Sequence, residues 1–118
     1  MSVHVPLNAS TRHLIDERRL ALMKPTAVLI NVARGRLVDE DALVDALRAG
    51  RLGGAGIDVF GEEPLTPQNP LLHLDNVVAT PHTAGVTRGT SRRRSEVCVG
   101  NAERILRGQP PLYQVTSW

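Results

Sequence analysis

The chain has 118 residues, a formal net charge of +2 and 42% hydrophobic residues, so it is long enough for one domain with its own core. This charge is not typical of a nucleic-acid-binding protein, no apolar run approaches the roughly 20 residues that span a membrane, and no signal peptide is visible. The single cysteine, Cys98, cannot form an internal disulfide, and it has no metal-ligand spacing with the histidines. We therefore expect a cytoplasmic protein without a metal site.

The first part of the chain predicts a strand end, a helix and a second strand. Residues 2–5 are β-prone and stop at a proline, and residues 12–23 predict a helix with Ser10 or Thr11 as its N-cap. Residues 27–32 form an apolar run that contains one asparagine. Such a run is typical of a parallel strand that is buried on both faces.

The remaining elements continue this alternation. Acidic residues open a helix at about residues 39–47, and residues 54–59 and 76–80 predict two more short strands. Residues 87–107 predict a long final helix. Cys98 lies on the apolar stripe of that helix, so we expect it to be a packed core thiol.

Strands that alternate with helices predict an α/β fold, a doubly wound parallel sheet of about four strands followed by a long C-terminal helix. In such sheets ligands bind beyond the carboxyl ends of the strands. The polar residues at those ends are the first candidates for a site. They are His4, Arg34, Asp58 and His82.

Four segments in chain order carry a resemblance to a known family. They are His4–Leu7, Asn31–Glu40, Asp58–Leu65 and Thr80–Gly85. Together they resemble the D-isomer-specific 2-hydroxyacid dehydrogenases, from about residue 3 to Val115. The resemblance implies a partial Rossmann-type sheet and an NAD(P)-dependent oxidoreductase that interconverts small 2-keto acids and D-2-hydroxy acids.

The resemblance also implies three catalytic residues. Arg34 would hold the substrate carboxylate, a bidentate task that suits a guanidinium. His82 would be the general acid and base, because a histidine titrates near working pH. Glu63, directly before a proline, would pair with His82 and favour its protonated form.

The implied cofactor is NAD, with NADP not excluded. Asp58 would approach the nicotinamide end, and the backbone of two strand ends and one loop would line the same molecule. The implied cofactor-binding residues are Val5, Val32, Ala33, Arg34, Asp58, His82, Thr83, Ala84 and Gly85.

The glycine-rich Gly-x-Gly-x-x-Gly loop of the family and its substrate domain do not occur in the chain. Residues 1–118 are therefore expected to be the C-terminal portion of a dinucleotide-binding domain, with little or no turnover when isolated. The partial sheet leaves the strand near Val3 without an inner neighbour, so we expect self-association or a homodimer.

Simpler interpretations exist for each candidate. Arg34 could be a surface arginine, His82 a turn histidine, Glu63 one of two solvated acids with Glu62, and Asp58 a strand cap. The arginines of residues 88–94 are best explained as a solvated helix face. At the level of the whole chain, the alternatives are a non-enzymatic, NAD-responsive module similar to the family's corepressors, or an inactive truncated remnant.

Overall fold

The structure is a computed structural model that describes residues 1–115. The chain divides into two compact units, the first over Met1–Ala84 and the second from Gly85 onward. The elements of the first unit are β1 (Ser2–Val3), α1 (Glu17–Ala21), β2 (Val28–Asn31), the 3₁₀ helix η1 (Gly35–Leu37), α2 (Glu40–Arg48), β3 (Gly54–Ile57), the 3₁₀ helix η2 (Pro70–His73) and β4 (Val77–Ala79). The second unit contains α3 (Arg88–Leu106).

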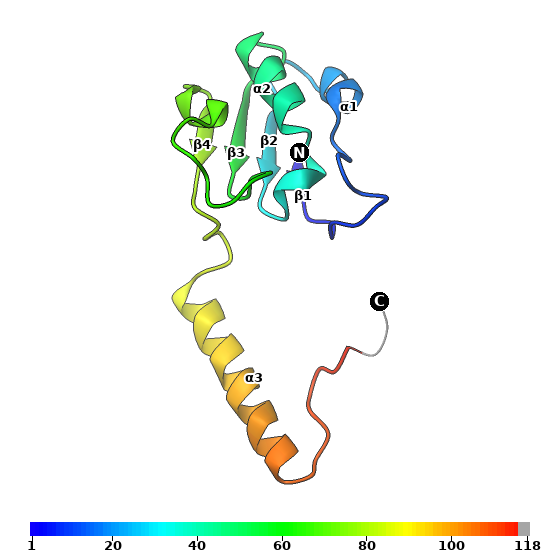
Figure 1. The fold of residues 1–118 in the computed structure, drawn as a ribbon, viewed down its shortest axis with the longest axis vertical. Helices are drawn as coiled ribbons and strands as arrows, with labels where there is room; N and C mark the ends of the chain where they lie inside the picture. The colour runs from blue at the N-terminus through cyan, green and yellow to red at the C-terminus, as the bar shows by residue number, and fades with distance from the viewer. Residues whose placement is uncertain (116–118) are drawn as a thin grey trace. The chain divides into compact units, whose positions relative to one another are not determined.

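The four strands form one parallel sheet, and they lie in the order in which they occur along the chain. Figure 1 shows the strands pointing the same way, so their carboxyl ends meet at one edge of the sheet. The predicted α/β fold with four parallel strands is confirmed. Polar residues that follow the strands are therefore brought to one edge, as sheet topology requires.

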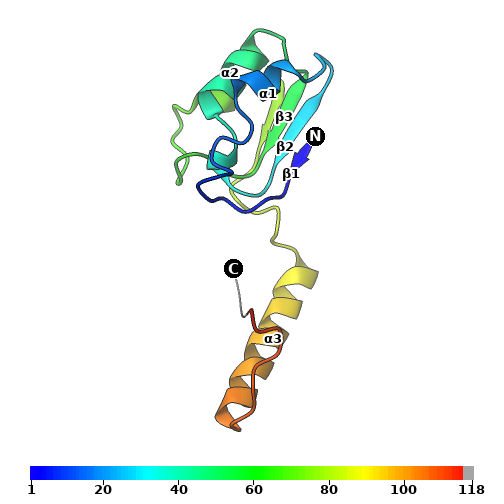
Figure 2. The ribbon, with the colours of Figure 1, turned by 90° about the vertical axis from the view of Figure 1, so that its right-hand side faces the viewer.

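The core of the first unit lies between the sheet and its two α-helices, which cover the same face of the sheet (Figure 2). Leu29 of β2, Leu20 of α1 and Leu43 of α2 are all almost fully buried. The prediction that the second strand is buried on both faces is wrong for this unit, because Val28 is 46% exposed. Side chains alternate between the two faces of a strand, and both helices pack on one of these faces.

The first helix is much shorter than the predicted span of residues 12–23. It begins after Asp16, whose carboxylate accepts a hydrogen bond from the Arg19 amide at 2.8 Å, so neither Ser10 nor Thr11 is the N-cap. The Asn8 side chain instead accepts hydrogen bonds from the amides of Ser10 and Thr11, and this competes with helix formation. Downstream, residue 15 forms a parallel bridge with residue 38.

The second helix agrees with its predicted position and has the expected ends. Asp39 is its N-cap and accepts a hydrogen bond from the Ala42 amide at 3.2 Å. Gly50, just beyond the other end, has a φ of +63°, a conformation that glycine adopts without strain. Buried leucine, valine and alanine side chains then fix its inner face to the core.

The final helix of the second unit also agrees with the predicted span of residues 87–107. Thr87 and Thr90 form a reciprocal capping box at its start, but no residue of α3 is buried. Cys98 is exposed, so the prediction of a packed core thiol is wrong within the described residues. No described helix is long and apolar enough to cross a membrane.

Candidate active site

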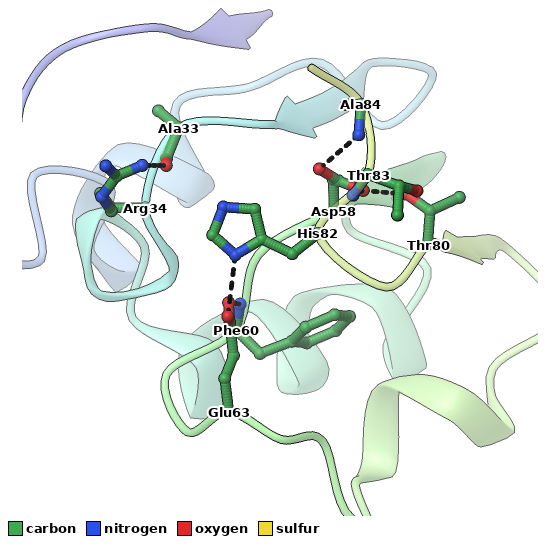
Figure 3. A network of polar contacts seen from close by, with 9 residues as sticks. All are labelled: Ala33, Arg34, Asp58, Phe60, Glu63, Thr80, His82, Thr83 and Ala84. Carbon is green, nitrogen blue, oxygen red and sulfur yellow. Dashed lines mark hydrogen bonds and ion pairs between the residues drawn. The ribbon is translucent and has the colours of Figure 1, made fainter. Parts of the chain in front are cut away.

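A glutamate–histidine pair connects the loops that follow β3 and β4. The Glu63 Oε2 atom lies 2.8 Å from the His82 Nδ1 atom, and the Glu63 Oε1 atom accepts a hydrogen bond from the Phe60 amide at 2.9 Å. Both side chains are partly exposed. Because Nδ1 is used by Glu63, the other ring nitrogen, Nε2, can take a second partner, and it has none among residues 1–115. Figure 3 shows that nitrogen on the side of the ring away from Glu63.

Asp58 holds the loop that carries His82. Asp58 is 3% exposed, and its carboxylate accepts hydrogen bonds from the Thr80 hydroxyl, from the Thr83 amide at 2.8 Å and from the Ala84 amide at 2.9 Å (Figure 3). Between these contacts His82 has a φ of +55°, a region that non-glycine residues occupy uncommonly. Asp58 therefore anchors the backbone on both sides of an unfavourable conformation.

Arg34 lies at the carboxyl end of β2, in a turn shaped by the buried Asn31. The Asn31 side chain donates to the Arg34 carbonyl at 2.9 Å and accepts from the Ala33 amide at 3.2 Å. The Arg34 guanidinium is exposed and donates to the Ala33 carbonyl at 2.6 Å. This contact occupies one nitrogen of the guanidinium, so other donors remain available to an anion.

Two hollows lie at this edge of the sheet. One, of about 610 Å³, is lined by residues from the ends of β1 and β2, namely His4, Val5, Pro6, Leu7, Val32, Ala33 and Arg34. The other, of about 470 Å³, has mainly apolar walls and includes Glu63 and His82. The arginine and the histidine loop therefore each line one of two hollows that follow the ends of the strands.

The residues predicted for the site fall into two groups. Val5, Val32, Ala33 and Arg34 share the first hollow. Glu63 and His82 are in contact, and Asp58 binds the amides of Thr83 and Ala84, so these five form the second group. Gly85 begins the second unit and belongs to neither.

The first unit of the structure coincides with a known sequence family. The family of the D-isomer specific 2-hydroxyacid dehydrogenases, NAD binding domain, matches residues 1–84. The chain belongs to this family. Its matched region ends at Ala84, which is also the last residue of the first compact unit.

Individual dehydrogenases agree with this assignment. The glyoxylate reductase of Thermofilum pendens is 50% identical over 111 residues, which are 94% of this chain and 33% of the relative. The TT0316 protein of Thermus thermophilus has a TM-score of 0.91 at 48% identity, over 98% of this chain and 37% of that one. The D-isomer specific 2-hydroxyacid dehydrogenase of Lactobacillus delbrueckii ssp. bulgaricus, solved in its NAD complex, has a TM-score of 0.86 at 38% identity, over 97% of this chain and 39% of that one. The chain thus spans about a third of the length of such relatives.

The first hollow fits one part of the dinucleotide that this family binds. It is lined by apolar residues of two strand ends together with two polar residues, His4 and Arg34. Such a surface suits a flat ring or a sugar that is oriented by a few polar groups. The chain has no Gly-x-Gly-x-x-Gly segment, so only the residues at the strand ends can be compared with the cofactor.

Sequence reasoning missed the residues that hold the loop of Glu63 in place. Glu40 accepts hydrogen bonds from the Gly61 amide and from the Asn69 side chain, and Arg36 donates to the Gly61 carbonyl. The sequence pattern assigns Glu40 only to an acidic helix start. Its spacing from Gly61 carries no local signal, because these contacts join residues more than twenty positions apart.

Two carboxyl groups of the candidate site, Glu63 and Asp58, make the free energy of unfolding depend on pH in the acidic range. For Glu63, hydrogen bonds from His82 and Phe60 lower the pKa below its ordinary value of 4.5. For Asp58, burial raises the pKa, but the hydrogen bonds from Thr80, Ala84 and Thr83 outweigh it and lower the pKa below 3.8. A lowered pKa in the folded state stabilises the protein above the unfolded pKa, and this stabilisation is lost as pH falls through the folded value.

We therefore expect Asp58→Asn to lower the free energy of unfolding at neutral pH by about 1.5–3 kcal/mol, because an amide oxygen cannot replace both carboxylate oxygens. We also expect this variant to lose less stability than the native chain as pH falls from about 5 to about 2. Urea unfolding at a series of pH values measures both effects. Asp41→Asn, at an exposed position of α2, is the control. An unchanged acid dependence in Asp58→Asn would contradict the prediction.

Proposed function

We propose that this chain supplies the proton-transfer and carboxylate-binding side chains of an NAD(P)-dependent D-2-hydroxyacid dehydrogenase. The observation that carries the proposal is the 2.8 Å contact between Glu63 and His82, at the sheet edge that also bears Arg34. A histidine oriented by a carboxylate and with one free nitrogen is suited to general acid–base chemistry. Membership of the dehydrogenase family supports the same assignment.

His82 is the proposed proton carrier. In the reducing direction its Nε2 atom donates a proton to the oxygen of the keto group, and in the oxidising direction it removes the proton from the hydroxyl group. Glu63 accepts the Nδ1–H, which fixes the orientation of the ring. Bound NAD or NADP supplies or accepts the hydride at the substrate C2.

Arg34 is the proposed anchor for the substrate carboxylate. A guanidinium presents parallel N–H donors that match the two oxygens of a carboxylate. The turn that Asn31 shapes presents this side chain at the mouth of the larger hollow. The substrate would thus be held by its acid group while its keto group faces His82.

The remaining proposals concern the protein around this site. Asp58 approaches the nicotinamide end of the cofactor, and the backbone of Val5, of residues 32–34 and of residues 82–85 lines the same molecule. Residues 1–118 make up the C-terminal portion of a dinucleotide-binding domain. The protein is cytoplasmic, and it self-associates or forms a homodimer. The edge position of β1 supports the last proposal, since an edge strand offers unpaired backbone groups.

A chimeric enzyme tests the function. Residues 1–115 replace the matching third of the Thermofilum pendens glyoxylate reductase, and glyoxylate reduction is measured with NADH and with NADPH. We expect turnover with at least one cofactor. We also expect Arg34→Gln to raise KM about a hundredfold, since a lost charged hydrogen-bond pair costs about 3 kcal/mol.

The control for Arg34→Gln is Arg48→Gln. Arg48 is exposed at the end of α2, so this substitution should leave KM unchanged. A folded chimera that binds the cofactor but does not reduce glyoxylate, hydroxypyruvate or lactate-type keto acids would overturn the proposed function. An Arg34→Gln chimera with native KM would overturn the role of Arg34.

A further inference from the structure

The loop that carries Glu63 is held by both backbone polar groups of a single residue, Gly61. The Gly61 amide donates to the Glu40 Oε2 atom at 3.0 Å, and the Gly61 carbonyl accepts from the Arg36 Nε atom at 3.2 Å. Both partners come from the segment that follows β2, which also presents Arg34. The turn from Phe60 to Glu63 is thus fixed against the neighbouring loop by opposite charges on its two sides.

The second oxygen of Glu40 extends this attachment to the far end of the loop. Its Oε1 atom accepts from the Asn69 side-chain amide at 2.6 Å, and the Asn69 oxygen accepts from the Leu71 amide at 2.9 Å. Glu40 is half-buried at the first turn of α2, a rigid element with four buried side chains. One carboxylate therefore connects both ends of residues 61–69 to the core.

The connection to the catalytic pair is short. Gly61 follows Phe60, whose amide donates to the Glu63 Oε1 atom at 2.9 Å, while the Glu63 Oε2 atom faces His82. The Phe60 amide is separated from the Phe60–Gly61 peptide only by the Phe60 Cα atom, so a movement of that peptide would also shift the donor that orients the Glu63 carboxylate. Within the described residues Glu40 forms no hydrogen bond with Glu63 or His82, so its action would be indirect.

We infer that Glu40 is a positioning residue for the Glu63–His82 pair, acting through the Gly61 amide. The effect of Glu40 on catalysis rests on the proposed function. The contacts that link Glu40 to Glu63 and His82 are present without any substrate. A charged acceptor suits this task, because a hydrogen bond to a carboxylate is about twice as strong as one between neutral groups. Loss of Glu40 would release Phe60 and leave Glu63 less firmly bonded.

The Glu63 pKa changes in opposite directions according to whether Glu40 positions the loop or only repels the Glu63 charge. Hydrogen bonds from His82 and Phe60 lower this pKa, and burial and the Asp58 charge oppose them. Removing the negative charge of Glu40 would by itself lower the Glu63 pKa further, because a like charge is taken away. Releasing the Phe60–Gly61 peptide would raise it, because hydrogen bonds to the charged form are weakened.

The test uses the 118-residue chain without cofactor or substrate. NMR titration follows the Glu63 side-chain carboxyl carbon against pH, together with the His82 Nδ1 signal and hydrogen exchange of the Gly61 amide. The variants are Glu40→Ala and Glu40→Gln, and Asp41→Asn on the same helix turn is the matched control for charge.

We expect Glu40→Ala to raise the Glu63 titration midpoint toward that of an ordinary glutamate, to shift the His82 Nδ1 signal, and to speed Gly61 exchange about tenfold or more. Glu40→Gln keeps one acceptor, so we expect changes in the same direction but smaller. Asp41→Asn should leave all three readouts unchanged or lower the midpoint slightly.

A native or lowered Glu63 midpoint in folded Glu40→Ala would overturn the inference. If Glu40→Ala unfolds, the test relies on Glu40→Gln. A native or lowered Glu63 midpoint in that variant would also overturn the inference. Because no turnover is measured, failure here leaves the proposed function standing. Conversely, an inactive chimera with the expected NMR changes would reject the function but not the positioning.

Discussion

His82→Asn is expected to lower kcat of the chimeric glyoxylate reductase by about 10²–10⁴-fold, the usual contribution of a positioned general acid or base. Asparagine has no group that can carry a proton to the keto oxygen. KM should stay close to native, because Arg34, and not the histidine, is the proposed anchor of the substrate carboxylate. Steady-state kinetics with glyoxylate and saturating cofactor measures both constants.

Asparagine is the informative replacement because it removes the group that transfers a proton while it retains the backbone conformation of residue 82. Residue 82 has a φ of +55°, and asparagine tolerates this region better than most residues. Its side-chain amide can also donate to Glu63 in the place of the His82 Nδ1–H. The variant should therefore fold with the Asp58 contacts to Thr83 and Ala84 intact.

The matched control is His73→Asn, in η2, where the ring contacts the Pro67 carbonyl at 3.0 Å. This variant should retain native kcat. If His82→Asn kept more than about a tenth of the native kcat, a role as general acid would be rejected. A large rise in KM with unchanged kcat would instead indicate that His82 binds the substrate without transferring a proton.

Gly35→Ala is expected to lower the free energy of unfolding by about 3 kcal/mol or more, near the upper end of the effects of single substitutions. An added Cβ would lie 1.9 Å from both the carbon and the oxygen of the Phe60 carbonyl, and 2.6 Å from the Gly61 nitrogen. Those atoms belong to the backbone, so no side-chain rotation relieves the overlap. Urea unfolding of the 118-residue chain measures the loss.

Gly50→Ala is the control, since Gly50 has a φ of +63° but no atom within 4 Å of an added Cβ. Its expected cost is about 1–2 kcal/mol and arises from backbone conformation alone. Equal losses for the two variants would contradict the packing argument. We also expect Gly35→Ala to disturb the Glu63–His82 contact, because the displaced peptide directly follows the Phe60 amide that donates to Glu63.

The sequence predicted the strands and the later helices well because their signals are local. Apolar runs with turn residues at each end located all four strands to within one or two residues. The first helix failed because the Asn8 side chain forms local turns and residue 15 pairs with residue 38. The Asn8 turns compete locally with the helix, whereas the pairing of residues 15 and 38 joins segments far apart in the sequence and has no local signal.

In the candidate site, too, some features were predictable from the sequence and others depend on contacts between distant segments. Topology alone placed Arg34, Asp58 and His82 at one edge of the sheet, and the resemblance selected Glu63 over its neighbour Glu62. The observed contact of Glu63 with His82 agrees with that choice, while the catalytic roles stay predictions. The attachment of Gly61 to Glu40 depends on how two loops meet in space, so it became visible only in the structure.

The order of the strands in the sheet has a consequence for synthesis of the chain. Each strand pairs with the next one made, so no strand has to be inserted between two that are already joined. On a ribosome, which releases the N-terminal part first, the pairing of β1, β2 and β3 can be complete before β4 emerges. Arg34 and Glu63 would then be in place first, and the arrival of the last strand would bring His82 to its partner. The contact between Glu63 and His82 would thus form only after the rest of the sheet has formed.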